Sequence, residues 1–198
     1  MKIFLERNER IRVVVDGQNV YGDVEAVYGS ISSGIHGNVK GDVFGSFTGD
    51  VRRDSTGNVG GDFKGDVGGH FEGDVGGDFE GNINGHFEGD VGGHFEGDVK
   101  DDFEGNVGGD FLGNVDGFYM GDVGNNFDGN IGGNFKGNVD GDFEGNIGGD
   151  FEGNIDGDFE GNIDGKINGV PYADLLAAYN AANRSEEEFQ AYLAGEIE

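Results

Sequence analysis

Hydrophobic and polar residues alternate along most of this chain with a fixed period. From Gly37 to Asn168 the sequence repeats a four-residue word, Gly-(Asp/Asn)-(Val/Ile/Phe)-x. From Val59 onward the apolar position alternates between a small branched residue and an aromatic one, so the true unit is eight residues or a multiple of eight. A unit this small cannot bury its own apolar face, so the repeat predicts a solenoid in which successive coils stack on one another.

The repeat also has a period of two. Odd-numbered residues are almost all Gly or apolar and even-numbered residues are mostly polar, which is typical of strands with one buried face. The recurring Gly predicts tight corners or a positive φ. Asp and Asn, which follow this Gly, tolerate the same left-handed conformation and can bond their own backbone, so we expect them to take part in the corners.

In-register stacking decides how many four-residue sides close one coil. Three sides would stack Val on Phe, and two sides would leave almost no room for Phe between the walls. Four sides place Val over Val and Phe over Phe, and secondary variation repeats every sixteen residues as well, as in Asn84, Lys100 and Asp116. We therefore predict an all-β, right-handed β-solenoid of about eight four-sided coils, each of about 16 residues, with about 4.8 Å between coils.

Both ends differ from the repeat, which suggests three segments. Residues 1–36 predict an N-terminal β cap, with strands over 2–6 and 11–15, followed by irregular first coils; residues 37–169 form the solenoid. Residues 170–198 predict two helices after Pro171. This tail either caps the last coil or also pairs two copies as a homodimer, through Leu175, Leu176, Tyr179, Phe189, Tyr192 and Leu193.

Composition changes this picture little. A net charge of -28 with only 34% hydrophobic residues would ordinarily indicate disorder, but 17 Phe at regular spacing favour a thin ordered core. The chain has no cysteine, which excludes disulfides and thiol chemistry. Neither a signal peptide nor a membrane span is evident, so we expect a cytoplasmic protein without a membrane partner.

Charge is concentrated on the regular repeat. Residues 59–164 contain 26 acidic and 3 basic residues, or about one net charge per 1.4 Å of axis at the strand spacing above, against about one per 1.7 Å in duplex DNA. Four-sided coils would stack Glu72, Glu88 and Glu104 in one column and Glu80 and Glu96 in another, which is unfavourable. The alternative is that one sign of charge only keeps a Gly-rich rod soluble.

These repeats and charges make the chain resemble two known groups. The Gly-(Asp/Asn)-apolar-x word and the helical tail are similar to the pentapeptide-repeat proteins, although the word has four letters and lacks that family's Ala-(Asp/Asn)-Leu core. The resemblance implies a square right-handed β-solenoid whose acidic members imitate duplex DNA, pair through C-terminal helices and occupy the DNA site of topoisomerases. A second resemblance, to the polymer-forming bactofilins, rests on Gly-x-Val steps.

Two functions are therefore expected for the chain. The first is an acidic nucleic-acid mimic that occupies the basic groove of a DNA- or RNA-binding protein, as an anti-defence or topoisomerase-directed inhibitor, without binding nucleic acid itself. The second is a structural or polymer-forming β-solenoid. The candidate partner-binding residues are Glu72, Asp74, Asp78, Glu80, Glu88, Asp90, Glu96, Asp98 and Glu104.

Other chemistry is weakly indicated. Calcium-binding β-rolls use nine-residue repeats, and here His70, His86 and His94 stand where a calcium ligand must be an oxygen. His70 and His86 are sixteen residues apart and would stack, but we interpret them as exposed corner residues. A phosphate loop would need a strand-to-helix setting and usually a Lys. We expect no catalytic residue, metal or cofactor, and hence no enzyme.

Overall fold

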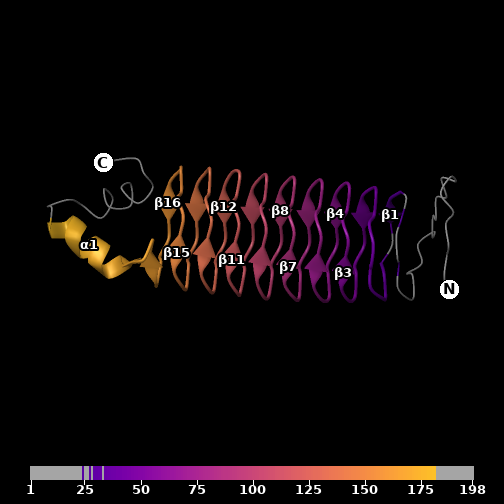
Figure 1. The fold of residues 1–198 in the computed structure, drawn as a ribbon, viewed down its shortest axis with the longest axis horizontal. Coiled ribbons are helices and arrows are strands. Elements are labelled where there is room, and N and C mark those ends of the chain that lie inside the picture. Colours follow the sequence, from indigo (N-terminus) through magenta and orange to yellow (C-terminus); the bar gives the residue numbers. More distant parts are fainter. Residues whose placement is uncertain (1–23, 25–26, 28, 33, 182–198) are drawn as a thin grey trace.

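The chain forms a rod of stacked coils in the computed structural model, which describes Val24, Val27 and residues 29–32 and 34–181 (Figure 1). Except at the C-terminal end, each strand pairs in parallel with the strand sixteen residues further along, as Phe79 pairs with Phe95 and Glu80 with Glu96. The predicted β-solenoid with a coil of sixteen residues is confirmed.

Two parallel sheets of two-residue strands form opposite sides of the rod. The first sheet contains β1 (Ile31–Ser32), β2 (Phe47–Thr48), β4 (Phe63–Lys64), β6 (Phe79–Glu80), β8 (Phe95–Glu96), β10 (Phe111–Leu112), β12 (Phe127–Asp128), β14 (Phe143–Glu144) and β16 (Phe159–Glu160). The second sheet contains β3 (Ser55–Thr56), β5 (Phe71–Glu72), β7 (Phe87–Glu88), β9 (Phe103–Glu104), β11 (Tyr119–Met120), β13 (Phe135–Lys136), β15 (Phe151–Glu152), β17 (Lys166–Ile167) and β18 (Val170–Pro171).

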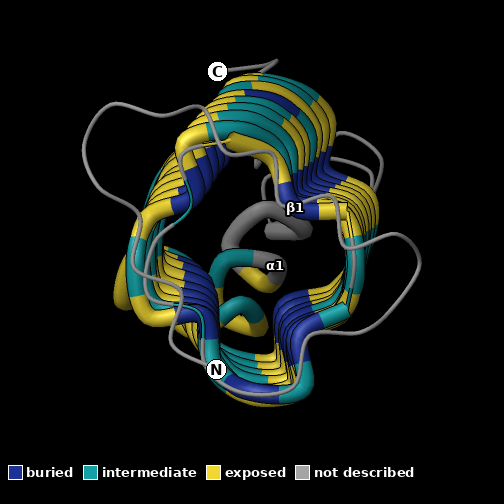
Figure 2. The backbone as a smooth tube through the Cα atoms, turned by 90° about the vertical axis from the view of Figure 1, so that its right-hand side faces the viewer, coloured by how far each residue is buried: buried dark blue, intermediate teal, exposed yellow. Residues whose placement is uncertain are grey.

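Two columns of single-residue parallel bridges complete the four sides. One column runs from Ile35 through Val51 to Ile163, and the other from Val27 through Val43 to Ile155. A view along the axis shows the four sides enclosing the core (Figure 2). Strands stay this short because the chain turns a corner every four residues.

The core consists of four separate columns of inward side chains, two of Phe and two of Val or Ile, as predicted. Within a column, Phe rings stack face to face, with the centroids of Phe111 and Phe127 4.7 Å apart. Across the core, rings of the two sheets meet edge to face, as Phe103 and Phe111 do at 5.3 Å and 90°. Both geometries are favourable for aromatic pairs, at about 0.5–1.5 kcal/mol beyond area burial.

The corners depend on one class of glycine. The Gly that follows each Phe-x pair has a positive φ; at Gly89 it is 143°, and a Cβ there would overlap the carbonyl oxygen of Gly73 in the preceding coil. Asp and Asn do not share this role, contrary to expectation. Among described residues other than Gly, only Asn168 has a positive φ.

The ends of the rod depart from the regular register. Val24 pairs with Val39, fifteen residues away, whereas Val27 pairs with Val43 at the regular sixteen, so the register slips by one residue here. At the other end β18 folds back antiparallel on β17, and α1 (Tyr172–Ala181) follows Pro171. The strands predicted over 2–6 and 11–15 and the second helix lie outside the described residues.

Candidate protein-binding faces

The nine candidate acidic residues are all exposed, but they lie on four different sides of the rod. Residues eight positions apart in sequence are half a coil apart and therefore occupy opposite sheets. The first sheet carries Asp78, Glu80 and Glu96, and the second carries Glu72, Glu88 and Glu104. Asp98 precedes the bridge column from Ile35 to Ile163, on the third face, and Asp74 and Asp90 precede the column from Val27 to Ile155, on the fourth face.

The glutamates form the predicted like-charge columns. Glu72, Glu88 and Glu104 are in register on neighbouring strands of the second sheet, and Glu80 and Glu96 are in register on the first. Like charges placed side by side in this way destabilise a sheet. The first glutamate of each column lies near a nitrogen of another side chain: Lys64 Nζ is 2.9 Å from Glu80 Oε2, and His86 Nε2 is 3.8 Å from Glu72 Oε1.

The pair between Lys64 and Glu80 is exposed and correspondingly weak. Its hydrogen bond and charge attraction raise the pKa of the Lys64 ammonium above the ordinary value. Exposed ion pairs contribute little to stability, so this pair cannot offset the repulsion along the whole column.

The aspartates have a structural task that the glutamates lack. Asp98 Oδ1 accepts hydrogen bonds from the backbone N–H of Asn114 at 2.8 Å and from its Nδ2 at 3.0 Å. Asp90 Oδ1 accepts the same two bonds from Asn106, at 2.8 and 3.1 Å. Such bonds recur from coil to coil at the Asp/Asn position, and we call each resulting column a hydrogen-bond ladder. Four of the candidates, Asp74, Asp78, Asp90 and Asp98, are members of such ladders.

Histidine serves as an acceptor in the same ladders. His70 Nδ1 accepts the backbone N–H of His86 at 3.1 Å, and His94 Nδ1 accepts that of Asp110 at 2.9 Å. The rings of His70 and His86 lie one above the other as predicted, with centroids 4.0 Å apart and planes tilted by 30°, but both residues are half-buried where exposed ones were expected. The position therefore favours a side-chain acceptor, which explains why Asp, Asn, His and the Ser46 hydroxyl all occur there.

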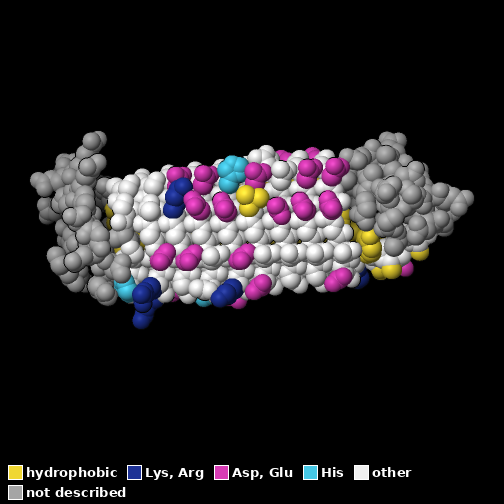
Figure 3. Space-filling view, turned by 180° about the vertical axis from the view of Figure 1, so that it is seen from behind, with side chains coloured by type: hydrophobic (Ala, Val, Ile, Leu, Met, Phe, Trp, Pro, Cys, Tyr) yellow, Lys and Arg dark blue, Asp and Glu magenta, His cyan; other side chains and the backbone are white. Residues whose placement is uncertain are grey.

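The first-sheet face, which comprises the outward residues of the first sheet and the residue before each of its strands, is the most acidic side. Its ten acidic residues between positions 59 and 164 stand against one base, Lys64, and rows of acidic side chains run along the rod (Figure 3). They span about six coils, or about 29 Å, which gives about one net charge per 3 Å; a single DNA strand carries about one per 3.4 Å. The acidic residues are Asp62, Asp78, Glu80, Glu96, Asp110, Asp128, Asp142, Glu144, Asp158 and Glu160.

Sequence reasoning missed most of this face. Residues such as Asp110, Glu144 and Glu160 belong to it but lie far along the chain from the selected candidates. Once the coil length is known, positions that differ by sixteen identify them. The second-sheet face is less uniform, because Lys136 follows Met120 in its column and pairs with Glu152 at 3.5 Å.

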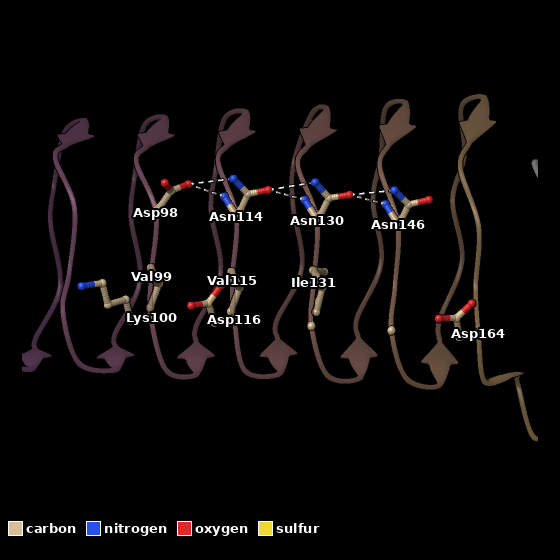
Figure 4. A pocket seen from close by; sticks show the side chains of 12 residues that line it. Asp98, Val99, Lys100, Asn114, Val115, Asp116, Asn130, Ile131, Asn146 and Asp164 are labelled. Carbon is tan, nitrogen blue, oxygen red and sulfur yellow. Dashed lines mark hydrogen bonds between the residues drawn. The ribbon is translucent and has the colours of Figure 1, made fainter.

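A shallow groove of about 440 Å³ runs along the third face. Its floor includes Gly132 and Gly148, where side chains are missing from the row, and Asp116 and Asp164 stand at either end of this gap (Figure 4). The amides of Asn114, Asn130 and Asn146 form one wall and bond one another in a ladder. The groove thus offers amides, carboxylates and Lys100, with no histidine or hydroxyl side chain in its lining.

The predicted dimerisation residues are only partly described. Leu175, Leu176 and Tyr179 lie on α1, and Leu175 is half-buried. Phe189, Tyr192 and Leu193 lie outside the described residues. Pairing of two copies through this segment stays a prediction.

Among the described residues, no group of three or more His, Asp or Glu side chains is arranged to hold a metal ion. No described helix has the length and apolarity needed to cross a membrane. No family model matches the chain, and neither a curated protein nor a solved structure is significantly similar to it.

Proposed function

We propose that this protein is an acidic nucleic-acid mimic that binds in the basic groove of a DNA- or RNA-binding protein and inhibits it, without a catalytic role. The observation that carries the proposal is the regular carboxylate rows on both sheet faces of one rod. Charge density on the first-sheet face is about that of a DNA strand. The four-sided coil also supports the proposal, because it resembles that of pentapeptide-repeat proteins whose acidic members imitate duplex DNA.

Rigidity is the second property that a mimic needs. The hydrogen-bond ladders and the stacked Phe columns fix every coil to the next, so the carboxylates are held at regular intervals before a partner arrives. Binding then orders few additional groups, which lowers its entropic cost. Like charges held in columns are unfavourable in the free protein, and basic partner side chains would relieve this repulsion.

Two features at the C-terminal end of the rod oppose the alternative function, that of a polymer-forming scaffold. There the second sheet ends in the antiparallel strand β18, whose Pro171 has no N–H to offer a further strand. The last inward residues are also covered, since Phe159 and Ile163 are each 5% exposed. Both features oppose end-to-end addition of another copy at this end.

The test is a pull-down across a salt series with duplex DNA as competitor. We expect a basic protein that is released by rising salt and displaced by DNA, because both ligands would engage the same lysines and arginines. Replacing Glu72, Glu80, Glu88, Glu96 and Glu104 with Gln should weaken its affinity about 100-fold, at about 0.5 kcal/mol for each exposed charge contact. The variant should remain folded, because the like-charge columns are relieved.

A matched control removes the same number of charges from the other two faces. Asn can replace Asp66, Asp74, Asp90, Asp98 and Asp122 without loss of the ladders, because Asn already occupies equivalent positions. This variant should retain most of the affinity. Equal losses in both variants would mean that only net charge matters, and full binding by the Gln variant would refute the mimic in favour of a structural role.

A further inference from the structure

The coil formed by residues 111–126, here called the central coil, departs from the repeat at four positions between residues 112 and 120. Leu112 and Met120 occupy outward positions that are Glu, Asp or Lys in neighbouring coils. Phe118 stands at a ladder position, and Tyr119 replaces a core Phe. These four exceptions fall within nine consecutive residues.

None of the four exceptions benefits the fold. Leu112 and Met120 are 38% and 40% exposed, and Glu96 and Glu104 at the equivalent positions one coil earlier show that the fold accepts an acid there. The backbone N–H of Phe118 donates a ladder bond to Asp102 Oδ1, but the Phe118 side chain offers no acceptor that would continue the ladder. Clustered departures of this kind, without a structural gain, indicate a functional site.

Tyr119 adds an independent observation. Its ring is fully buried in the second-sheet Phe column, and its hydroxyl has no hydrogen-bond partner among the described residues. A buried, unpaired hydroxyl is unfavourable. The central coil is therefore less well optimised for stability than the coils around it.

The two exposed apolar residues interrupt both acidic rows at the same level. Leu112 lies between Glu96 and Asp128 on the first sheet. Met120, half a coil further along, lies between Glu104 and Lys136 on the second sheet. The interruptions thus face opposite directions at one height of the rod.

A uniform charged rod has no unique binding position along its axis. Moving a basic partner by one coil would recreate nearly the same charge contacts, so charge alone attracts without fixing the register. In protein–DNA recognition, phosphate contacts likewise carry no sequence information, and contacts to the bases specify the site. Exposed apolar side chains surrounded by polar ones match the anatomy of a protein interface, which has an apolar core, enriched in Met, and a polar rim.

We propose that the central coil is the docking centre that fixes the register of the basic partner, with Leu112 and Met120 as apolar anchors. The inference rests on the proposed function. The occupant is a protein cleft with two basic walls, each carrying an apolar pocket at its centre. The charge contacts of the acidic rows are screened by salt, whereas the apolar contacts of the two anchors would persist at high salt.

Two synthetic peptides test the anchors without knowledge of the natural partner. One is all lysine, and the other is identical except for a central phenylalanine. Methyl NMR of the full chain should show that the phenylalanine peptide binds about tenfold more tightly and perturbs Leu112 and Met120 most. Equal affinities with an even response along the rod would overturn the proposal.

Two variants extend the test to the partner recovered by DNA displacement. Leu112→Glu with Met120→Glu adds two acids, so a purely electrostatic rod would bind more tightly, whereas loss of the anchors should weaken binding about tenfold. Adding Glu96→Leu and Glu104→Met to that variant moves both anchors by one coil and returns the amino-acid composition to that of the natural chain. The affinity for the phenylalanine peptide should then be restored, and the NMR response should move to residues 96 and 104.

The two proposals fail in different ways. If the first of these variants binds the partner as tightly as the natural chain while salt and DNA still displace it, the docking centre is wrong and the mimic stands. If the partner ignores salt and DNA, the mimic is wrong whatever the peptides show.

Discussion

Tyr119 shows how a single atom can disturb an otherwise uniform core. Its ring keeps the stacking geometry, parallel to Phe103 at 4.8 Å and perpendicular to Phe111 at 5.3 Å. Only the hydroxyl distinguishes it from its neighbours, and this group is buried without a partner among the described residues. Burial, with the nearby charges of Asp122 and Asp90, raises the pKa of the Tyr119 phenol well above its ordinary value.

Tyr119→Phe should therefore stabilise the protein by about 1–2 kcal/mol, because it removes an unsatisfied buried hydroxyl. The effect should grow with alkalinity. Above a pH of about 10 the unfolded phenol loses its proton while the folded one keeps it, so the unfolded state binds fewer protons and the free energy of unfolding falls as pH rises. Urea unfolding of both proteins at neutral and alkaline pH measures this, and equal pH slopes would contradict it.

The glycines show what residue-level reading of the sequence could and could not predict. It predicted that Gly forms the corners, and the Gly after each Phe-x pair is indeed never replaced between positions 49 and 161. The Gly two positions after each core Val or Ile is less constrained, because other residues replace it at Arg53, Asp101 and Asn125. The prediction that Asp and Asn adopt the left-handed corner conformation is wrong, because their side chains serve as hydrogen-bond acceptors. His70 and Ser46 at the same positions indicate this acceptor role.

The hydrogen-bond ladders explain how two-residue strands can hold together. Strands this short make few backbone bonds within each sheet, and the remaining bonds come from single bridges such as Val75 N–H to the carbonyl of Asp90 at 2.8 Å. Ladder side chains add a further bond between coils at most corners. The Asn members add a second one through Nδ2, as Asn130 does to Asn114 Oδ1 at 3.0 Å.

Asp98 allows the ladder to be tested. Asp98→Asn should leave stability unchanged, because an amide oxygen accepts the same bonds from Asn114. Asp98→Ala should cost about 1–2 kcal/mol, because both bonds from Asn114 lose their acceptor at an exposed site. Thermal unfolding of the two variants compares them, and equal melting temperatures would show that the ladder contributes nothing.

At the scale of the whole molecule, the sequence predicts the coil length but not the side of the rod on which the acidic residues are densest. Sixteen followed from the size of Phe and from sequence variation with that period. The candidate residues, from Glu72 to Glu104, belong to one stretch of sequence. Because every sixteen residues pass all four faces, neighbours in this stretch lie on different sides of the rod. Glu80 and Glu88, eight residues apart, consequently lie on opposite sheets.

Insertions test the coil length directly. Four residues added after Gly109 would place Phe111 over Val99 and shift every later column against its partner, whereas sixteen would add one coil and preserve all columns. We expect the first insertion to lower the free energy of unfolding by several kcal/mol, since stacked pairs contribute about 0.5–1.5 kcal/mol each. Urea unfolding measures both, and equal tolerance would refute the coil length.

The direction of the bonds between coils has a mechanical consequence. Bonds such as Val75 N–H to Asp90 and Gly92 N–H to Val75 link one coil to the next, so they run along the rod. A force that pulls the two ends apart would stretch these bonds in turn at the exposed end instead of shearing many at once. Each coil that peels away would release its sixteen residues, about 50 Å of extended chain, so that under tension the rod would lengthen in equal steps.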